Sequence, residues 1–141
     1  MLSLFIKTET IRDYGYPIAE FVIWSDDWEF TRRISRDLPC YIVKNSVVVH
    51  AMKNNTVVSI ARDNQERLER YKFFYRNDVF LYRREGIKGW LWVIAKDCWH
   101  AFQTLVYRHP FRIKYIIAGF VQGLRFNPAI EKYEGHNNGT D

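Results

Sequence analysis

Three carboxylates and two tryptophans gather in one short stretch, Trp24-Ser25-Asp26-Asp27-Trp28-Glu29-Phe30. Aromatic residues stand on both sides of the acids and between them, which favours acids in the wall of a site over a solvated helix face. If Asp26 caps a helix, its side chain accepts the backbone N–H of Glu29, and Glu29 reaches back in a capping box. Asp27 is then the ionised carboxylate of the first turn that is placed to accept a proton.

A helix over residues 26–36 is predicted to carry these acids. Phe30, Ile34 and Leu38 recur every four residues, so they form one apolar stripe along such a helix. A shorter helix is expected over residues 8–14, because a glycine and a proline follow it closely.

Short strands are predicted on either side of these helices. The first covers residues 2–6, and two more cover residues 41–43 and 47–49, where β-branched residues are frequent. His50 follows the last of these strands directly, so it is expected at a strand end.

Beyond Ile60 the apolar period changes from two residues to 3.6, and the chain is predicted to be helical up to about residue 126. The first helix covers residues 63–85 and stops at a glycine, and the second covers about residues 87–107. The third opens at Pro110, because proline is favoured at the first position of a helix.

The second of these helices has two adjacent apolar rows, with Lys96, His100 and Gln103 on the opposite side. Aromatic rows of this kind belong to a core far more often than to a ligand site. We therefore interpret them as core first and as a membrane-facing surface second. The rows consist of Trp90, Ile94, Cys98, Ala101 and Leu105, and of Leu91, Ala95, Trp99, Phe102 and Val106.

The net charge of +5 on 141 residues is unevenly distributed. Residues 1–60 carry seven of the 21 Lys and Arg and seven of the 16 Asp and Glu, so the rest of the chain carries fourteen against nine. In residues 62–72, however, the basic residues alternate with acids, which is typical of a solvated, salt-bridged helix face. This pattern argues against nucleic acid as a partner.

The two cysteines and the N-terminus indicate the compartment. Cys40 and Cys98 are far apart and outside any Cys-x-x-Cys spacing, so they predict neither a disulfide framework nor a zinc site. Residues 1–7 lack the basic start and the long apolar run of a secretory signal. We therefore expect a chain that stays in the cytoplasm, in a reducing environment.

Taken in order, the motifs resemble the C-terminal half of a family 2 glycosyltransferase, in the branch of the galactofuranosyl- and rhamnosyltransferases. The resemblance covers nearly the whole chain up to about residue 126. The motifs are Phe5-Ile6, Glu9-Thr10-Ile11, Gly15-Tyr16-Pro17, Phe21-x-Ile23-Trp24-x-Asp26-Asp27-x-Glu29-Phe30, Arg33, Val47-Val48-Val49-His50, Tyr71-x-x-x-Tyr75-Arg76-Asn77 and Gly119-x-x-x-Gly123-Leu124-Arg125.

The resemblance implies an α+β fold. Residues 1–60 would form the acceptor and catalytic-base part of a GT-A domain, with short strands and the catalytic helix. Residues 61–126 would form a helical C-terminal region, and residues 127–141 a flexible tail.

The implied activity is inverting transfer of a sugar from a nucleotide-sugar donor to a hydroxyl of a glycan or lipid-linked acceptor, in cell-surface polysaccharide synthesis. In this family the second aspartate of the pair acts as the base, which here is Asp27. Asp26 and Glu29 would then shape the acceptor end of the site. Trp24 and Trp28 would stack on a sugar face.

The resemblance also implies a metal ion and a second half. His50 matches the histidine that joins the Mg²⁺ or Mn²⁺ site, where the metal neutralises the leaving diphosphate. The family binds the nucleotide on an N-terminal half that ends in an Asp-x-Asp motif, and this sequence contains no such motif. We therefore expect a truncated enzyme with little or no turnover by itself.

An alternative of another class is a non-catalytic helical module with a relic site. The helices after Ile60 would then dock on an anionic membrane surface or on a partner protein. Both readings expect a cytoplasmic chain, peripheral on the inner face of the cell membrane.

Overall fold

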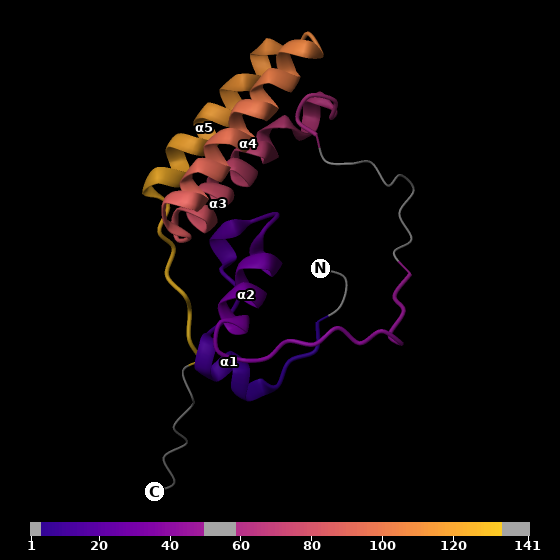
Figure 1. Ribbon diagram of the computed structural model, residues 1–141, viewed down its shortest axis with the longest axis vertical. Helices are drawn as coiled ribbons and strands as arrows, with labels where there is room; N and C mark the ends of the chain where they lie inside the picture. Colours follow the sequence, from indigo (N-terminus) through magenta and orange to yellow (C-terminus); the bar gives the residue numbers. More distant parts are fainter. Residues whose placement is uncertain (1–3, 50–58, 134–141) are drawn as a thin grey trace, which may run out of the picture. The chain divides into compact units, whose positions relative to one another are not determined.

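A computed structural model describes residues 4–49 and 59–133, and these residues are helical (Figure 1). They contain no strand, so the predicted α+β fold with a partial GT-A domain is wrong. The α-helices are α1 Thr8–Tyr14, α2 Asp26–Ser35, α3 Tyr71–Arg83, α4 Gly86–Val106 and α5 Ile113–Arg125, and the 3₁₀ helices are η1 Ala19–Phe21, η2 Gln65–Arg70 and η3 Pro110–Arg112.

The β-branched runs at 41–43 and 47–49 are not strands in the part of the chain that the structure describes. A strand needs a neighbour that takes up its backbone N–H and C=O groups. Within the described residues, the runs at 41–43 and 47–49 have no ladder partner, and Ser46 N–H closes a turn onto the carbonyl of Val43 at 3.1 Å. Their side chains are exposed, Ile42 to 93%.

The described part of the predicted first strand, residues 4–6, also lacks regular structure.

The chain divides into two compact units. The first consists of residues 1–19, 26–51 and 128–141, and the second of residues 20–25 and 52–127. The predicted division at residues 60 and 126 was drawn from composition and resemblance, and it stays a prediction.

Arg33 organises the first unit. Its guanidinium pairs with Glu29 one helical turn earlier on α2, at 3.0 Å. It also donates to the carbonyl oxygens of Tyr14, the last residue of α1, and of Tyr16. Gly15 has φ +77°, and a Cβ there would lie 2.5 Å from the Ile130 side chain. Residues 128–133 are thus held against the end of α1.

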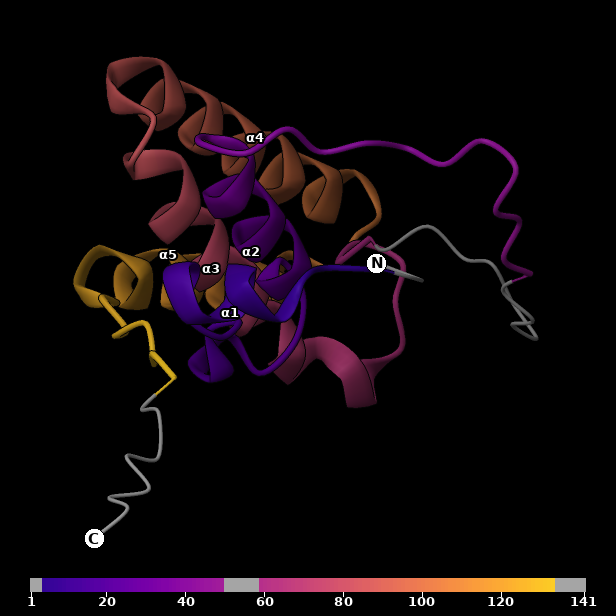
Figure 2. The same ribbon diagram turned by 90° about the horizontal axis from the view of Figure 1, so that it is seen from below.

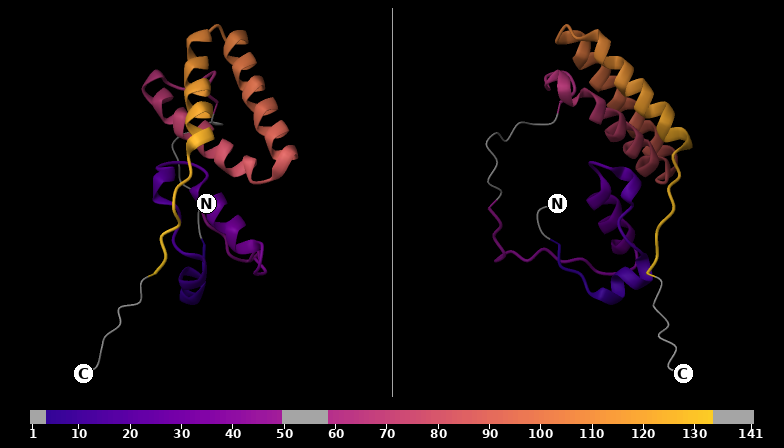
Figure 3. Two further views of the ribbon diagram at one scale, coloured as in Figure 1. Left: turned by 90° about the vertical axis from the view of Figure 1, so that its left-hand side faces the viewer. Right: turned by 180° about the vertical axis from the view of Figure 1, so that it is seen from behind.

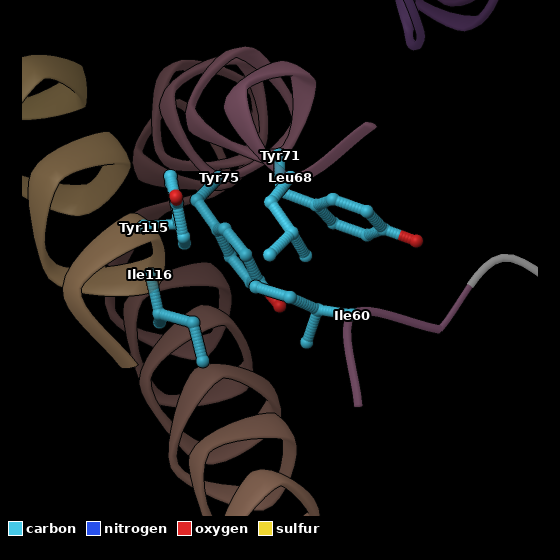
Figure 4. Packing of buried hydrophobic residues seen from close by; sticks show 6 residues of the cluster. All are labelled: Ile60, Leu68, Tyr71, Tyr75, Tyr115 and Ile116. Carbon is cyan, nitrogen blue, oxygen red and sulfur yellow. The ribbon is translucent and has the colours of Figure 1, made fainter. Parts of the chain in front are cut away.

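The second unit is built on α3. Its apolar stripe faces α5 and α4, as the sequence period predicts. In Figure 3, α4 and α5 run antiparallel to each other, and Figure 2 shows α3, α4 and α5 from another direction. The core seen in Figure 4 consists of Ile60, Leu68, Tyr71, Tyr75, Tyr115 and Ile116.

Two glycines let α5 approach α3 closely. A Cβ on Gly119 would lie 2.6 Å from the carbonyl oxygen of Lys72 and 2.7 Å from the Cβ of Tyr75. One on Gly123 would lie 2.6 Å from the Cβ of Val79. The Gly119-x-x-x-Gly123 spacing therefore sets the distance between the two helices, since neither position has room for a side chain.

We expect Gly119→Ala to lower the free energy of unfolding by about 1–3 kcal/mol, the usual cost of overpacking a core. Alanine favours a helix interior over glycine, so a loss of stability would come from the clash with α3 alone. Urea denaturation measures the change, with the exposed α5 variant Gln122→Ala as control. A Gly119→Ala protein as stable as the wild type would show that the helices separate without cost.

Helix α4 is turned the opposite way from the prediction. The interpretation of the row Leu91 to Val106 as core is wrong, because Leu91, Trp99 and Phe102 are each more than half exposed. The other row is divided, since Ala101 packs against the core whereas Leu105 is 53% exposed. Val93, Asp97 and Thr104 are buried instead. No helix within residues 4–49 and 59–133 combines the length and the apolar character that crossing a bilayer requires.

Candidate functional site

The backbone just before Asp26 is strained. Val22, Trp24 and Ser25 have positive φ angles of 63°, 62° and 68°. Side chains other than glycine rarely adopt this left-handed region, and each such residue costs about 1–3 kcal/mol. Ile23 N–H also donates to the carbonyl of Phe21 at 2.6 Å, which closes a three-residue turn around Val22.

Asn77 of α3 holds this turn in place. Its side chain is fully buried, and its amide nitrogen donates to the carbonyl oxygens of Phe21 at 3.0 Å, Ile23 at 3.1 Å and Trp24 at 3.0 Å. With two N–H bonds for three acceptors, at least one hydrogen bond is shared. The amide thus satisfies carbonyl groups that the left-handed turn leaves without a helix or strand partner.

Arg76 supports Asn77 from the preceding position. Its guanidinium donates to the Asn77 amide oxygen at 3.1 Å and 3.0 Å, and also to the carbonyl of Glu20. The guanidinium carbon lies 3.9 Å from the centre of the Phe126 ring. All polar groups of the Asn77 amide are therefore engaged, which fixes its orientation.

Asp78, the next residue of α3, contacts Ser25 at the end of the strained segment. The Ser25 hydroxyl donates to the Asp78 carboxylate at 3.4 Å, and the Lys96 ammonium of α4 donates to its other oxygen. Burial raises the pKa of Asp78, and the charge of Lys96 opposes this effect. Three consecutive residues of α3, Arg76 to Asp78, thus hold residues 20–25.

A second carboxylate, Asp97, lies beside Lys96. The ammonium is 3.3 Å from Asp97 Oδ1, close enough for charge attraction, yet neither Asp97 oxygen accepts a hydrogen bond from the residues described. Burial raises the pKa of Asp97 to about 6, the charge of Lys96 opposes the rise, and the charge of Asp78 adds to it. The buried cluster therefore holds one cation between two acids.

Aromatic side chains surround Trp24, which the sequence predicts to be a site residue. Its ring packs against Tyr71 and Phe74, with ring centroids 5.3 Å and 5.8 Å apart. Tyr75 and His100 continue the group, with the Tyr75 hydroxyl 3.0 Å from His100 Nδ1. Burial lowers the pKa of His100 to about 4, so this imidazole is neutral at pH 7. Trp24 remains partly exposed.

The predicted carboxylates lie at the start of α2. Helix α2 begins at Asp26 itself, and Glu29 pairs with Arg33 instead of reaching back, so the predicted capping box is not formed. The Asp27 carboxylate accepts the backbone N–H of Trp28 at 2.8 Å. Asp27 is half-buried, and Trp28 is exposed with the Arg32 guanidinium over its ring.

Glu29 has a structural partner. It is 4% exposed and bound to Arg33, which links α2 to the end of α1. Its predicted role toward an acceptor stays a prediction.

The metal ligand expected from the resemblance, His50, lies outside the described residues. Within those residues, no three side chains of His, Cys, Asp or Glu are grouped so that they could hold a cation. Binding of Mg²⁺ or Mn²⁺ stays a prediction.

Sequence reasoning missed most of the support for the Trp24 stretch. The sequence pattern places Asn77 in a motif without indicating its partners, and it does not predict the contacts of Asp78 and Asp97. One signal was present in the sequence, because Asn77-Asp78 and Lys96-Asp97 interrupt otherwise apolar helical runs. Polar residues at such positions are commonly buried with partners.

Comparisons with known proteins found no match for this chain. No model of a protein family matches the sequence. No curated protein matches it. No solved structure matches the fold.

Proposed function

We propose that this chain supplies the acceptor side and the catalytic base of an inverting glycosyltransferase that uses a nucleotide-sugar donor. The proposal concerns the site and not the GT-A fold. The acceptor would be a glycan or lipid-linked hydroxyl of a cell-surface polysaccharide, reached from the cytoplasmic side of the membrane.

One observation carries the proposal. Two motifs of the resemblance that are about fifty residues apart in sequence meet in the structure, where the Asn77 amide holds the carbonyl groups of Phe21, Ile23 and Trp24. Strained backbone persists where the surroundings enforce it, and it clusters at functional sites. The chain enforces such strain in the residues that lead directly into Asp26 and Asp27.

In the proposed reaction, Asp27 accepts the proton of the acceptor hydroxyl while that oxygen attacks the anomeric carbon. The nucleoside diphosphate leaves with the electron pair of the broken glycosidic bond. Asp26, which is exposed, would hydrogen-bond the acceptor, and the exposed ring of Trp28 or the open edge of Trp24 would stack on its sugar. Metal binding by His50 stays a prediction.

To test the proposal, the chain is combined with a second polypeptide, the nucleotide-binding half of a galactofuranosyl- or rhamnosyltransferase. Release of UDP or TDP is measured with an oligosaccharide acceptor. We expect Asp27→Asn to reduce turnover by roughly 10²- to 10⁴-fold, the usual contribution of a general base. Donor affinity should be kept, since the base does not hold the nucleotide.

Asp26→Asn is the matched control, because it removes the same charge from the neighbouring residue. It should raise the KM for the acceptor and leave the proton transfer intact. The chain without the second polypeptide sets the baseline and should release no nucleotide. Near-normal turnover of Asp27→Asn would show that Asp27 is not the base.

A further inference from the structure

The outer face of α4 is apolar along the whole helix. Its exposed side chains recur every three or four residues, so they share one face. Leu91 is 63% exposed, and Trp92 and Trp99 are 57% exposed each. Lys88 is the one charged residue on this face, whose other exposed members are Ile87, Ile94, Ala95, Cys98, Phe102, Leu105 and Val106.

Helix α5 widens this surface. Ile117, Val121 and Leu124 form an exposed stripe on it, each at least 46% exposed. A groove of about 260 Å³ lies between α4 and α5 and joins the two stripes, since Ile94 and Ile117 both line it. The outer face of α4, this groove and the α5 stripe are called the α4–α5 surface below. Figure 3 shows the two helices that form it.

The α4–α5 surface cannot turn inward while α4 keeps its polar contacts. The Lys96 ammonium is bound to Asp78 of α3, and His100 Nδ1 lies 3.0 Å from the Tyr75 hydroxyl. Rotating α4 to bury its apolar face would expose these groups and break both contacts. The exposure of Leu91, Trp99 and Phe102 is therefore built into the packing of the second unit.

The charges around the surface are mainly positive. The only acidic residue between positions 86 and 127 is Asp97, which is 6% exposed. The exposed charged residues of this region are Lys88, Arg108, Lys114 and Arg125. The exposed cations outnumber the acids near this face, which are Glu85 just before α4 and the buried Asp97 that lines the groove. A wide apolar face with a mainly cationic border complements a layer that is apolar inside and anionic at its surface.

We propose that the α4–α5 surface docks on an anionic lipid bilayer, with α4 lying in the plane of the membrane. Apolar patches on soluble monomers seldom exceed a few hundred Å², and this one extends along 21 residues of α4. Exposed tryptophans with flanking Lys and Arg are typical of helices that lie at the membrane interface. The inference does not depend on the proposed sugar transfer.

The experiment is sedimentation of the full chain with phosphatidylcholine vesicles, with and without 30% phosphatidylglycerol. We expect binding to the anionic vesicles, weaker binding in high salt because exposed charges are screened, and quenching of tryptophan fluorescence by brominated lipids. Trp92→Phe with Trp99→Phe should remove most of that quenching. Equal binding to neutral vesicles, or no binding, would overturn the proposal.

Two sets of variants locate the contact. Leu91→Glu with Phe102→Glu should abolish vesicle binding, whereas Ile42→Glu with Val47→Glu is the matched control, with the same change at exposed apolar residues of the first unit. Lys88→Ser with Lys114→Ser leaves the apolar face intact and should weaken binding roughly 30-fold, from about 1 kcal/mol for each basic residue near an anionic surface.

Light scattering, which measures the oligomeric state, distinguishes docking on a membrane from docking on a second copy of the chain. A monomer in solution that binds vesicles agrees with the proposal. A dimer that Leu91→Glu with Phe102→Glu converts to a monomer, without vesicle binding by the wild type, would mean that a second copy of the chain covers this surface.

Discussion

Replacing Asn77 by alanine is expected to lower the free energy of unfolding by at least about 3 kcal/mol. The change removes the amide that donates to the carbonyl groups of Phe21, Ile23 and Trp24. Leaving one buried polar group without its partner costs about 1–3 kcal/mol. The carbonyl groups of Ile23 and Trp24 lose their donor, whereas that of Phe21 keeps the N–H of Ile23. The Arg76 guanidinium loses an acceptor as well.

Urea denaturation followed by circular dichroism measures this change. Asn64→Ala is the matched control, because Asn64 is exposed and its side chain makes no capping hydrogen bond to the 3₁₀ helix that follows. Equal losses for the two variants would show that the turn at residues 21–24 is held by something other than Asn77. A larger loss for Asn77→Ala would support its role in enforcing the positive φ angles.

The same variant connects stability with the proposed chemistry. Because the turn that Asn77 holds carries Trp24, one of the residues proposed to stack on the acceptor sugar, Asn77→Ala should also reduce turnover in the two-polypeptide assay, at a temperature where the variant is still folded. Asp27→Asn should cost less stability than Asn77→Ala, since asparagine keeps the shape and the amide oxygen that can accept the Trp28 N–H, although the Asp27 carboxylate has further partners. Stability and turnover therefore respond differently at the two positions.

The sequence predicted the helices well because their signals are local. The expected short helix at residues 8–14 is α1, and the expected helix at residues 26–36 is α2 Asp26–Ser35. The predicted helix over residues 63–85 is the 3₁₀ helix η2 Gln65–Arg70 followed by α3 Tyr71–Arg83, and Gly86, the predicted stop, is the first residue of α4. Pro110 opens η3, where the third helix is predicted to begin. Such signals act within one turn of helix.

The sequence failed where the outcome depends on distant partners. The runs at 41–43 and 47–49 have the composition of strands but lack a neighbour in the described structure. The capping box at Asp26 and Glu29 has the right spacing, yet Arg33 competes for the Glu29 carboxylate. Both are local patterns that a tertiary contact, or the lack of one, overrides.

The orientation of α4 also depends on distant partners that the sequence pattern does not reveal. Its apolar rows alone favour burial, and only the Asp78 partner for Lys96 explains why the polar side faces inward. For the candidate site, the roles of Trp24, Asp26 and Asp27 stay predictions from the sequence. It did not identify how Asn77 and Asp78 hold the backbone before them, because that contact joins positions more than fifty residues apart.

Asp97→Asn is expected to stabilise the protein by up to about 3 kcal/mol at pH 7.5, with the gain disappearing near pH 4. Burial is the main cause that raises the pKa of Asp97 from 3.8 to about 6. The folded state therefore binds a proton more tightly than the unfolded state, and its stability falls as the pH rises from about 4 to about 6. A shift of about two pKa units corresponds to about 3 kcal/mol.

Asparagine removes this titration and leaves Lys96 paired with Asp78, so the buried cluster becomes neutral. Thermal unfolding of both proteins between pH 4 and pH 7.5 measures the difference, and the exposed Glu66→Gln should show no comparable dependence on pH. A variant that is less stable than the wild type at pH 7.5 would mean that the attraction of Lys96 at 3.3 Å outweighs the cost of burying the Asp97 charge. Burial should prevail, since Lys96 already hydrogen-bonds Asp78 and neither Asp97 oxygen accepts a hydrogen bond from the described residues.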